Sequence, residues 1–152
     1  MIDLNRIHHT GMIVDDIDAA QATLGTSLGL QWAPVRTFDP LPFWTPEQGA
    51  HELHVKATYS IGAPHHLELV QGDGPFYDPR RTSDSRHIGV FTDDLTGEVE
   101  RLQGAGWTVV AAGAPPQDGY GIICYIAPPL PGLLVELIST GLKPILDDWL
   151  GD

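Results

Sequence analysis

Two stretches of nine residues, 78 positions apart, read almost the same in this chain. Residues 9–17 read HTGMIVDDI and residues 87–95 read HIGVFTDDL, so each begins with His-x-Gly and ends with two aspartates and an apolar residue. Each is followed later by a glutamate between apolar residues, Glu68 in the first copy and Glu136 in the second. The repeat predicts two copies of one module, with two histidines and two glutamates at matched positions.

Strand and helix patterns follow each copy of the repeat in the same order. Alternating, β-branched residues at 7–14 predict a strand, after which Asp15 or Asp16 can cap a helix that ends between residues 25 and 29. In the second copy Asp93 or Asp94 can cap a helix that ends near Gly104 and Gly106. Further strands are predicted at residues 31–36, 50–59 and 65–71, and at 108–112, 121–127 and 133–139. The fold class is therefore α+β, with two tandem βαβββ modules.

The domain organisation follows from these modules. Module 1 covers about residues 5–72, a turn-rich connector about 73–84, module 2 about 85–140, and a tail 141–152. The proline-broken segment 41–46 predicts a loop, which either covers a site or packs outside the sheet. In the tail, Pro144 can start a short helix whose apolar side needs a neighbour, either the sheet or a second subunit.

Charge and composition exclude several classes of partner. The chain of 152 residues has a net charge of -12 and only eight Lys and Arg residues, which argues against nucleic acid and an anionic membrane surface as partners. No run of apolar residues approaches the roughly 20 that span a bilayer, and no signal sequence is recognisable, so we expect a cytoplasmic protein. The single cysteine, Cys124, lies in an apolar run and predicts a structural role in a strand.

The matched histidines and glutamates form a candidate metal site. Strand alternation places Glu68 opposite Leu67 and Leu69, so it points away from the helices if the leucines pack beneath them. Two modules related by a pseudo-twofold axis bring the first and last strands of both around one cavity. The four residues would then form a nitrogen and oxygen site for one divalent Mn, Fe, Co, Ni or Zn ion. The predicted ligands are His9, Glu68, His87 and Glu136.

The other histidines are less informative. His66 shares the face of Glu68 and is a weak candidate for contacting either the ligands or the substrate. Alternation puts His8 on the face opposite His9, where it is either packed or exposed. Surface positions are expected for the histidines without a counterpart in the other module, namely His51, His54 and His65.

From Ile7 to Ser139 the chain resembles the vicinal oxygen chelate superfamily, which includes glyoxalase I, methylmalonyl-CoA epimerase, extradiol dioxygenases, and fosfomycin- and bleomycin-resistance proteins. The resemblance implies a single domain whose paired modules form a cupped, barrel-like mixed sheet with helices on the outside. It implies metal ligands on the first and fourth strands of each module, with a His, Glu, His, Glu set like that of bacterial-type glyoxalase I. It also implies a homodimer, with the site closed within one chain or across the interface.

The resemblance also implies the chemistry. A divalent ion that chelates two adjacent substrate oxygens is a Lewis acid that makes a neighbouring C–H acidic enough for a carboxylate to remove. Glu136 is the first candidate for this proton transfer and Glu68 the second. Pro46-Glu47-Gln48-Gly49 resembles an epimerase segment with an acid/base glutamate, which makes Glu47 a third candidate. The expected enzyme is a lyase, isomerase or epimerase acting on a small 2-oxo acid, hemithioacetal or acyl thioester.

Two alternatives and one departure from the family remain. The first alternative is an Fe(II) ring-cleaving dioxygenase, but such enzymes normally use three protein ligands and this chain offers four. The second is a non-catalytic binder of a drug or metabolite, but such proteins have often lost the ligands that are all present here. Ala127-Pro128-Pro129-Leu130 stands where coenzyme-A-binding epimerases have a lysine, which argues against a thioester. Five cations are available to hold an acidic substrate group, although solvent exposure is expected for most: Arg36, Lys56, Arg80, Arg81 and Arg86.

Overall fold

The computed structural model describes residues 1–80 and 86–151, so part of the expected connector, with Arg81, lies outside the described residues. The strands are β1 Ile7–Ile13, β2 Gln31–Trp32, β3 Arg36–Thr45, β4 Gly49–Ile61, β5 His66–Gly72, β6 Arg86–Thr92, β7 Thr108–Ala112, β8 Ile123–Ala127 and β9 Val135–Ser139. The α-helices are α1 Ile17–Leu28, α2 Leu95–Gly104 and α3 Lys143–Leu150. Short 3₁₀ turns lie at Leu4–Arg6, Pro116–Asp118 and Thr140–Leu142.

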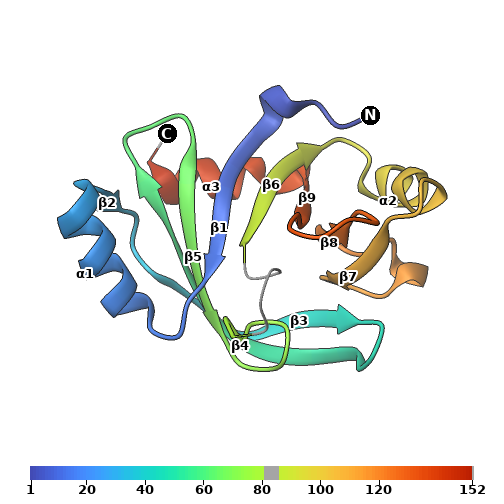
Figure 1. Cartoon of the computed structure of the whole chain (residues 1–152), viewed down its shortest axis with the longest axis horizontal. Helices are drawn as coiled ribbons and strands as arrows, with labels where there is room; N and C mark the ends of the chain where they lie inside the picture. The colour runs from blue at the N-terminus through green and yellow to red at the C-terminus, as the bar shows by residue number, and fades with distance from the viewer. Residues whose placement is uncertain (81–85, 152) are drawn as a thin grey trace.

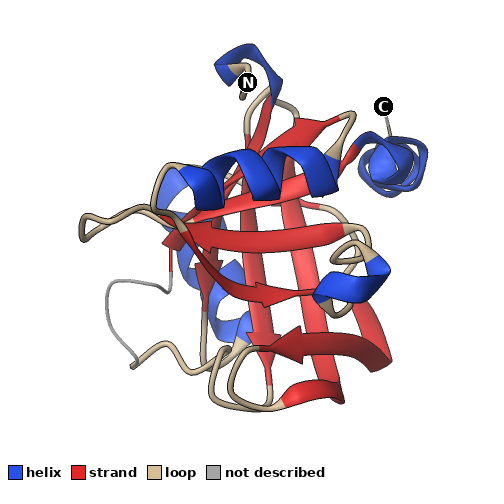
Figure 2. Ribbon diagram, turned by 90° about the vertical axis from the view of Figure 1, so that its right-hand side faces the viewer, coloured by secondary structure: helices blue, strands red, loops and turns tan. Residues whose placement is uncertain are grey.

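The strands form one mixed sheet that closes on itself. Their order is β2-β4-β3-β7-β8-β9-β6-β1-β5, and β5 pairs back with β4, so every strand except the short β2 belongs to a closed ring. Figures 1 and 2 show this curved sheet from two directions, with α1 and α2 on its outside. This arrangement confirms the predicted cupped, barrel-like fold.

The two modules meet in the middle of the sheet with the symmetry that the repeat predicts. The first strand of each module pairs in parallel with its last strand, β1 with β5 and β6 with β9. The two first strands, β1 and β6, pair antiparallel with each other. Gly11 is opposite both Glu68 on β5 and His87 on β6, while Gly89 is opposite both Glu136 on β9 and His9 on β1. These pairings bring the four predicted ligands to the same level of the barrel.

The helices cover the outer face as the alternation of residues requires. α1 begins at an N-cap in which Asp16 accepts a hydrogen bond from the backbone N–H of Ala19, and Asp94 caps α2 in the same way through Gly97. The apolar face of α2 packs on outward-facing β9 residues such as Leu137, which is fully buried. Since Leu137 faces outward, its neighbour Glu136 faces the interior of the barrel.

The segment 41–46 is not the loop that its prolines predict. Residues 36–45 form β3, which pairs with β4 along most of its length. On its other side β3 meets β7 only through Trp44 and Ala112. Because an edge without a partner does not need backbone N–H donors, Pro40 and Pro42 are tolerated there. The first module therefore has two strands, β2 and β3, where one was expected.

The tail forms the predicted short helix, α3, and its neighbour is the barrel of the same chain. Leu146, Trp149 and Leu150 are buried in the cluster of apolar residues that fills the interior, whereas Ile145 is exposed. α3 lies across the sheet in Figure 1, unlike α1 and α2 at the two ends. Among the described residues, no helix has the length and apolar character needed to cross a membrane.

Candidate metal centre

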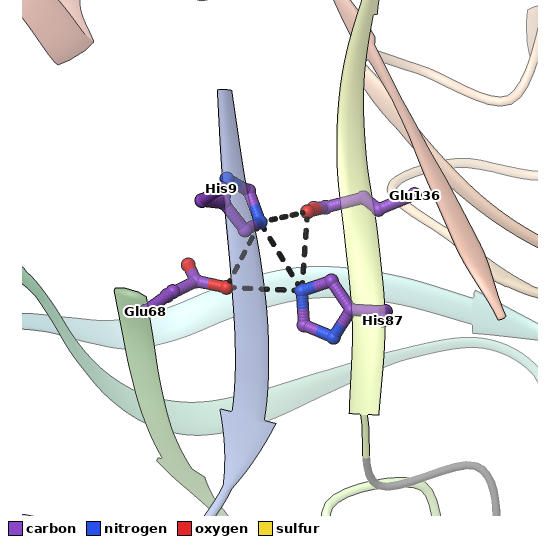
Figure 3. A group of neighbouring side chains, drawn as sticks. All are labelled: His9, Glu68, His87 and Glu136. Carbon is purple, nitrogen blue, oxygen red and sulfur yellow. Dashed lines mark hydrogen bonds and ion pairs between the residues drawn. The ribbon is translucent and has the colours of Figure 1, made fainter. Parts of the chain in front are cut away.

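The four predicted ligands converge inside the barrel. His9 comes from β1, Glu68 from β5, His87 from β6 and Glu136 from β9, and one ligand atom of each lies within 4.8 Å of all the others. All four side chains are buried. Figure 3 shows them pointing toward one another from separate strands, with the imidazole nitrogens facing the carboxylates.

The distances within this cluster are those of atoms gathered around one point. His9 Nε2 lies 3.2 Å from Glu68 Oε2 and 3.0 Å from Glu136 Oε2. His87 Nε2 lies 3.0 Å from the same Glu68 oxygen and 3.5 Å from the Glu136 oxygen. The two Nε2 atoms are 3.2 Å apart. Each histidine thus contacts both carboxylates, including the one supplied by the other module.

The glycine of each His-x-Gly motif leaves space for the histidine of the other module. A Cβ atom added to Gly11 would overlap the ring of His87, and one added to Gly89 would overlap the ring of His9. Because β1 and β6 pair antiparallel, the two contacts are equivalent. The repeat therefore encodes a ligand and the space for the opposite ligand within three residues.

The electrostatics of the cluster resemble those of a site for a cation. Burial alone would favour neutral imidazole, but the adjacent Glu68 and Glu136 carboxylates raise the pKa of His9 to about 10. The same carboxylates raise the pKa of His87 despite its burial. In turn the histidines hold the pKa of Glu68 well below its usual range and lower that of Glu136, although burial opposes both shifts. The site therefore holds two buried carboxylates that require compensating positive charge.

The donor set fits a divalent transition metal. Two imidazole nitrogens and two carboxylate oxygens, with no thiolate, suit Mn, Fe, Co, Ni or Zn. Glu136 Oε2 is buried and lies 3.0 Å from His9 Nε2 and 3.5 Å from His87 Nε2, but in the described part of the chain no donor is aligned with it for a hydrogen bond. A bound cation would satisfy this oxygen, which is otherwise costly to bury.

A cavity opens beside the cluster. Glu68 and Glu136 line it together with Tyr59, Tyr77 and Tyr125, and its volume is ≈ 170 Å³. The remainder of its wall is mainly apolar and includes Val55, Val70, Ile138 and Leu146. A small molecule in this cavity would have both carboxylates at one end.

The chain matches the sequence profile of a known protein superfamily. The profile of the glyoxalase/bleomycin resistance protein/dioxygenase superfamily matches residues 8–125, which include three of the four clustered side chains. The chain belongs to this superfamily. The resemblance drawn from the His-x-Gly repeat is therefore confirmed, whereas the roles of the individual residues stay predictions.

Several solved structures share the fold of this chain at low identity. Methylmalonyl-CoA epimerase from Mycobacterium tuberculosis is 18% identical with a TM-score of 0.57, and the match covers 96% of this chain and 97% of that one. A variant of the Streptomyces coelicolor epimerase in complex with 2-nitronate-propionyl-CoA is 17% identical with a TM-score of 0.55, covering 88% and 96%. A hypothetical protein from Bacillus halodurans C-125 is 17% identical with a TM-score of 0.54, covering 88% and 93%. A comparison with curated protein sequences found no match.

His8 lies beside His9 and not on the opposite face. The pairing of β1 with β6 shifts register between Ile7 and His9, so a β-bulge at His8 interrupts the alternation. His8 Nδ1 lies 2.9 Å from His9 Nδ1, on the side of the ring away from the cluster. Burial and the nearby His9 and His66 lower the pKa of His8 to about 4. Neutral His8 can thus accept a hydrogen bond from His9, as partners of metal-binding histidines commonly do.

The remaining predicted residues are not at the cluster. His66 is buried and donates from Nδ1 to the Ser60 carbonyl at 2.7 Å, and it stacks near His8 rather than lining the cavity. Glu47 is exposed in the turn between β3 and β4 and does not line this cavity, and its acid/base role stays a prediction. His54 and His65 are exposed as expected, but His51 is half-buried against Phe43.

Two tyrosines at the cluster are absent from the sequence prediction. Tyr59 on β4 pairs with Glu68, and Tyr125 on β8 pairs with Glu136, so they occupy equivalent places in the two modules. Their rings lie edge-on to the module's own histidine, with centroids 5.4 Å apart for Tyr59 and His9 and 5.3 Å for Tyr125 and His87. Both pKa values are raised well above normal by burial and by the glutamates. In the sequence each glutamate is preceded, on the previous strand, by a tyrosine. This match between the modules was the signal that could have predicted both tyrosines at the cluster.

Of the four candidate cations that the structure describes, one reaches the cavity. Arg36 is half-buried and lines it, whereas Lys56, Arg80 and Arg86 are exposed, as predicted for most of them. Arg81 lies outside the described residues. Cys124 is fully buried in β8, and burial raises the pKa of its thiol to about 12, in keeping with a structural role.

Proposed function

We propose that this protein is a metal-dependent lyase, isomerase or epimerase that moves a proton on a small molecule with two adjacent oxygens. The observation that carries this proposal is the buried convergence of His9, Glu68, His87 and Glu136 at one end of a cavity. A divalent ion held by these residues would supply Lewis-acid activation of the C–H next to the chelated oxygens. Membership of the superfamily supports the same class of chemistry.

The two glutamates differ in how freely they can exchange a proton with a substrate. Glu68 Oε2 lies in hydrogen-bond contact with His87 Nε2 at 3.0 Å and also faces the Tyr59 hydroxyl. Glu136 Oε2 lies 3.0 Å from His9 Nε2, but no donor among the described residues is aligned with it for a hydrogen bond, and Glu136 lines the cavity. A carboxylate that exchanges a proton with substrate must be free to change its contacts. We therefore assign the proton transfer to Glu136 and a holding role to Glu68.

The apolar cavity favours the reaction by excluding water. A carboxylate in a dry pocket is a stronger base toward a bound substrate than one in water, because solvent no longer stabilises its charge. Val70 and Ile138, which follow the two glutamates on β5 and β9, line the same cavity. They would hold the body of the substrate against the carboxylates.

Metal reconstitution tests the site first. Metal-free protein is loaded separately with Mn, Fe, Co, Ni and Zn, and the retained metal is measured after desalting. We expect about one ion per chain in the wild type and in Glu100→Gln, which changes an exposed carboxylate on α2. We expect substantially less in His87→Ala and Glu136→Gln. Failure of all five metals to bind tightly to the wild type would overturn the proposal.

Solvent-deuterium exchange then tests the chemistry. Loaded protein is incubated in D₂O with 2-oxo acids, hemithioacetals and acyl thioesters, and deuterium entering next to the carbonyl is followed by NMR. The wild type should exchange at least one class, and Glu136→Gln should exchange it far more slowly. Oxygen uptake with catechols, and no exchange, would instead identify a ring-cleaving dioxygenase.

A further inference from the structure

The cavity beside the cluster has a second end, which the ligands do not reach. At this end the wall is made by α3 and by the start of β3, with Arg36, Phe38, Leu146 and Trp149 among the lining residues. The two glutamates line the same cavity from β5 and β9. A molecule in the cavity thus has carboxylates at one end and α3 at the other.

Helix α3 is fixed to the barrel by specific contacts. The Trp149 indole N–H donates to the Pro34 carbonyl at 2.7 Å, and its ring lies edge-on to Tyr59 with centroids 5.0 Å apart. Phe38 packs against the same indole at a centroid distance of 6.2 Å. The indole N–H, two aromatic contacts and two buried leucines hold α3 in place. Because α3 is fixed, it limits the length of a molecule bound in the cavity.

Arg36 supplies positive charge at this end. In the described part of the chain it is the one Lys or Arg side chain that lines the cavity. Its guanidinium carbon lies 4.7 Å from the centroid of the Trp149 ring, and its side chain is 37% exposed. A guanidinium stacked on an indole is held in a defined place and stays charged.

The existing partner of Arg36 leaves most of its donors available. Arg36 Nη2 lies 3.5 Å from Asp148 Oδ2, and the Asp148 side chain is 86% exposed. An ion pair with a carboxylate so open to solvent is weak. A guanidinium has five N–H donors, so an incoming carboxylate could form a two-point contact without displacing Asp148.

The dimensions of the cavity favour compact substrates. Its volume of ≈ 170 Å³ lies below the roughly 300–1,000 Å³ of pockets that enclose drug-sized ligands. The cavity therefore suits a compact molecule that ends at Arg36.

We propose that the substrate is a compact acid with an apolar body, whose carboxylate pairs with Arg36 while its oxygen-bearing end faces Glu68 and Glu136. This inference rests on the proposed function for what happens at the glutamates. It adds that Arg36 determines specificity for an acid over its neutral counterpart.

Binding of matched probes tests the role of Arg36. Hexanoate and 4-phenylbutanoate, with their neutral amides hexanamide and 4-phenylbutanamide, are titrated into metal-loaded and metal-free protein by calorimetry. The wild type should prefer each acid to its amide. Arg36→Gln should weaken the acids about tenfold or more and leave the amides within about twofold, because a charge-assisted contact is lost.

Two control variants separate specificity from structure. Lys56→Gln removes the same charge from an exposed position on the neighbouring strand β4 and should leave both acids unaffected. Arg36→Lys keeps the charge and should retain a preference for acids. Circular dichroism and thermal melting of each variant show whether it is folded, and the acid-to-amide ratio is independent of the folded fraction.

The outcomes distinguish this inference from the proposed function. Metal binding by the wild type, with acid affinities unchanged in Arg36→Gln, would overturn the inference and leave the function standing. Tight binding of propionyl-CoA that is insensitive to Arg36→Gln would also overturn it. Absence of metal binding would overturn the proposed function. An acid preference that depends on Arg36 in the metal-free protein would still support the binding of a carboxylate by Arg36 in this cavity.

Discussion

The ring of His87 occupies the space that a side chain at Gly11 would fill. The two residues face each other across the antiparallel pair of β1 and β6, in the centre of the sheet. Gly89 and His9 repeat the relationship from the other module. A ligand of each module thus depends on a glycine of the other, and this interdependence can be tested by a single methyl group.

Gly11→Ala should displace His87 and impair metal binding. The added methyl group overlaps a buried ring that β5 and β9 also confine, so we expect a loss of about 1–3 kcal/mol in the free energy of unfolding. Metal retained after desalting should fall well below one ion per chain. Urea denaturation and metal analysis measure the two effects.

Gly104→Ala is the matched control for this substitution. Gly104 ends α2, and an added Cβ there would meet nothing within 4 Å. Alanine is the better helix former by up to about 1 kcal/mol, so this variant should be as stable as the wild type or more stable, with full metal binding. Equal metal binding by Gly11→Ala and Gly104→Ala would contradict the steric dependence.

The repeat was sufficient to predict the cluster because strand periodicity is a local property. Once His9 and Glu68 are placed on the first and last strands of a module, alternation sets their face and duplication supplies His87 and Glu136. The structure brings these four together, as the sequence predicts. For Glu47 the sequence offers only a resemblance to an epimerase segment, which does not indicate where its turn lies, so its acid/base role stays a prediction.

Other features depend on irregularities that periodicity does not reveal. The bulge at His8 turns that side chain toward His9, and the prolines of β3 are compatible with a strand only because most of one edge is unpaired. Arg36 reaches the cavity because α3 folds back onto the barrel, a contact between residues more than a hundred positions apart. These relationships are set by tertiary packing and have no short-range pattern.

Metal-free protein should lose stability as the pH rises from about 6.5 to about 10. The pKa of His9 is about 10 in the folded protein and about 6.5 in an unfolded chain, and that of His87 is also raised, so the folded state binds more protons in this range. The stabilisation is fully present below pH 6.5 and is lost as the pH rises through 10. Denaturation with a chelator present, across this range, measures the slope.

Two variants identify the groups responsible for this pH dependence. His87→Asn removes one of the two buried rings whose pKa is raised, and the stability curve should be flatter than in the wild type. His65→Asn removes an exposed histidine that contacts Thr10, and the slope should be unchanged. A slope that is the same in all three proteins would show that the cluster does not hold these protons.

Metal binding should release about one proton, from His9, near pH 7.5. Because the neighbouring carboxylates raise the pKa of His9 to about 10, its ring is protonated at this pH and must lose a proton to become a ligand. Calorimetric titration in buffers of different ionisation enthalpy measures the release. Apparent affinity should also rise with pH between 6 and 9. Binding without proton release would mean that the metal does not use these histidines.

Trp149→Phe should loosen α3 without unfolding the barrel. The phenyl ring keeps the apolar contact with Tyr59, but the Pro34 carbonyl loses the donor that lies 2.7 Å away, at a cost of about 1 kcal/mol. Ile145→Ala, on the exposed side of the same helix, should change stability by no more than about 0.5 kcal/mol. Hydrogen exchange of the α3 amides should therefore accelerate in Trp149→Phe and not in Ile145→Ala. If exchange is equally fast in both, the indole N–H does not hold the helix in place.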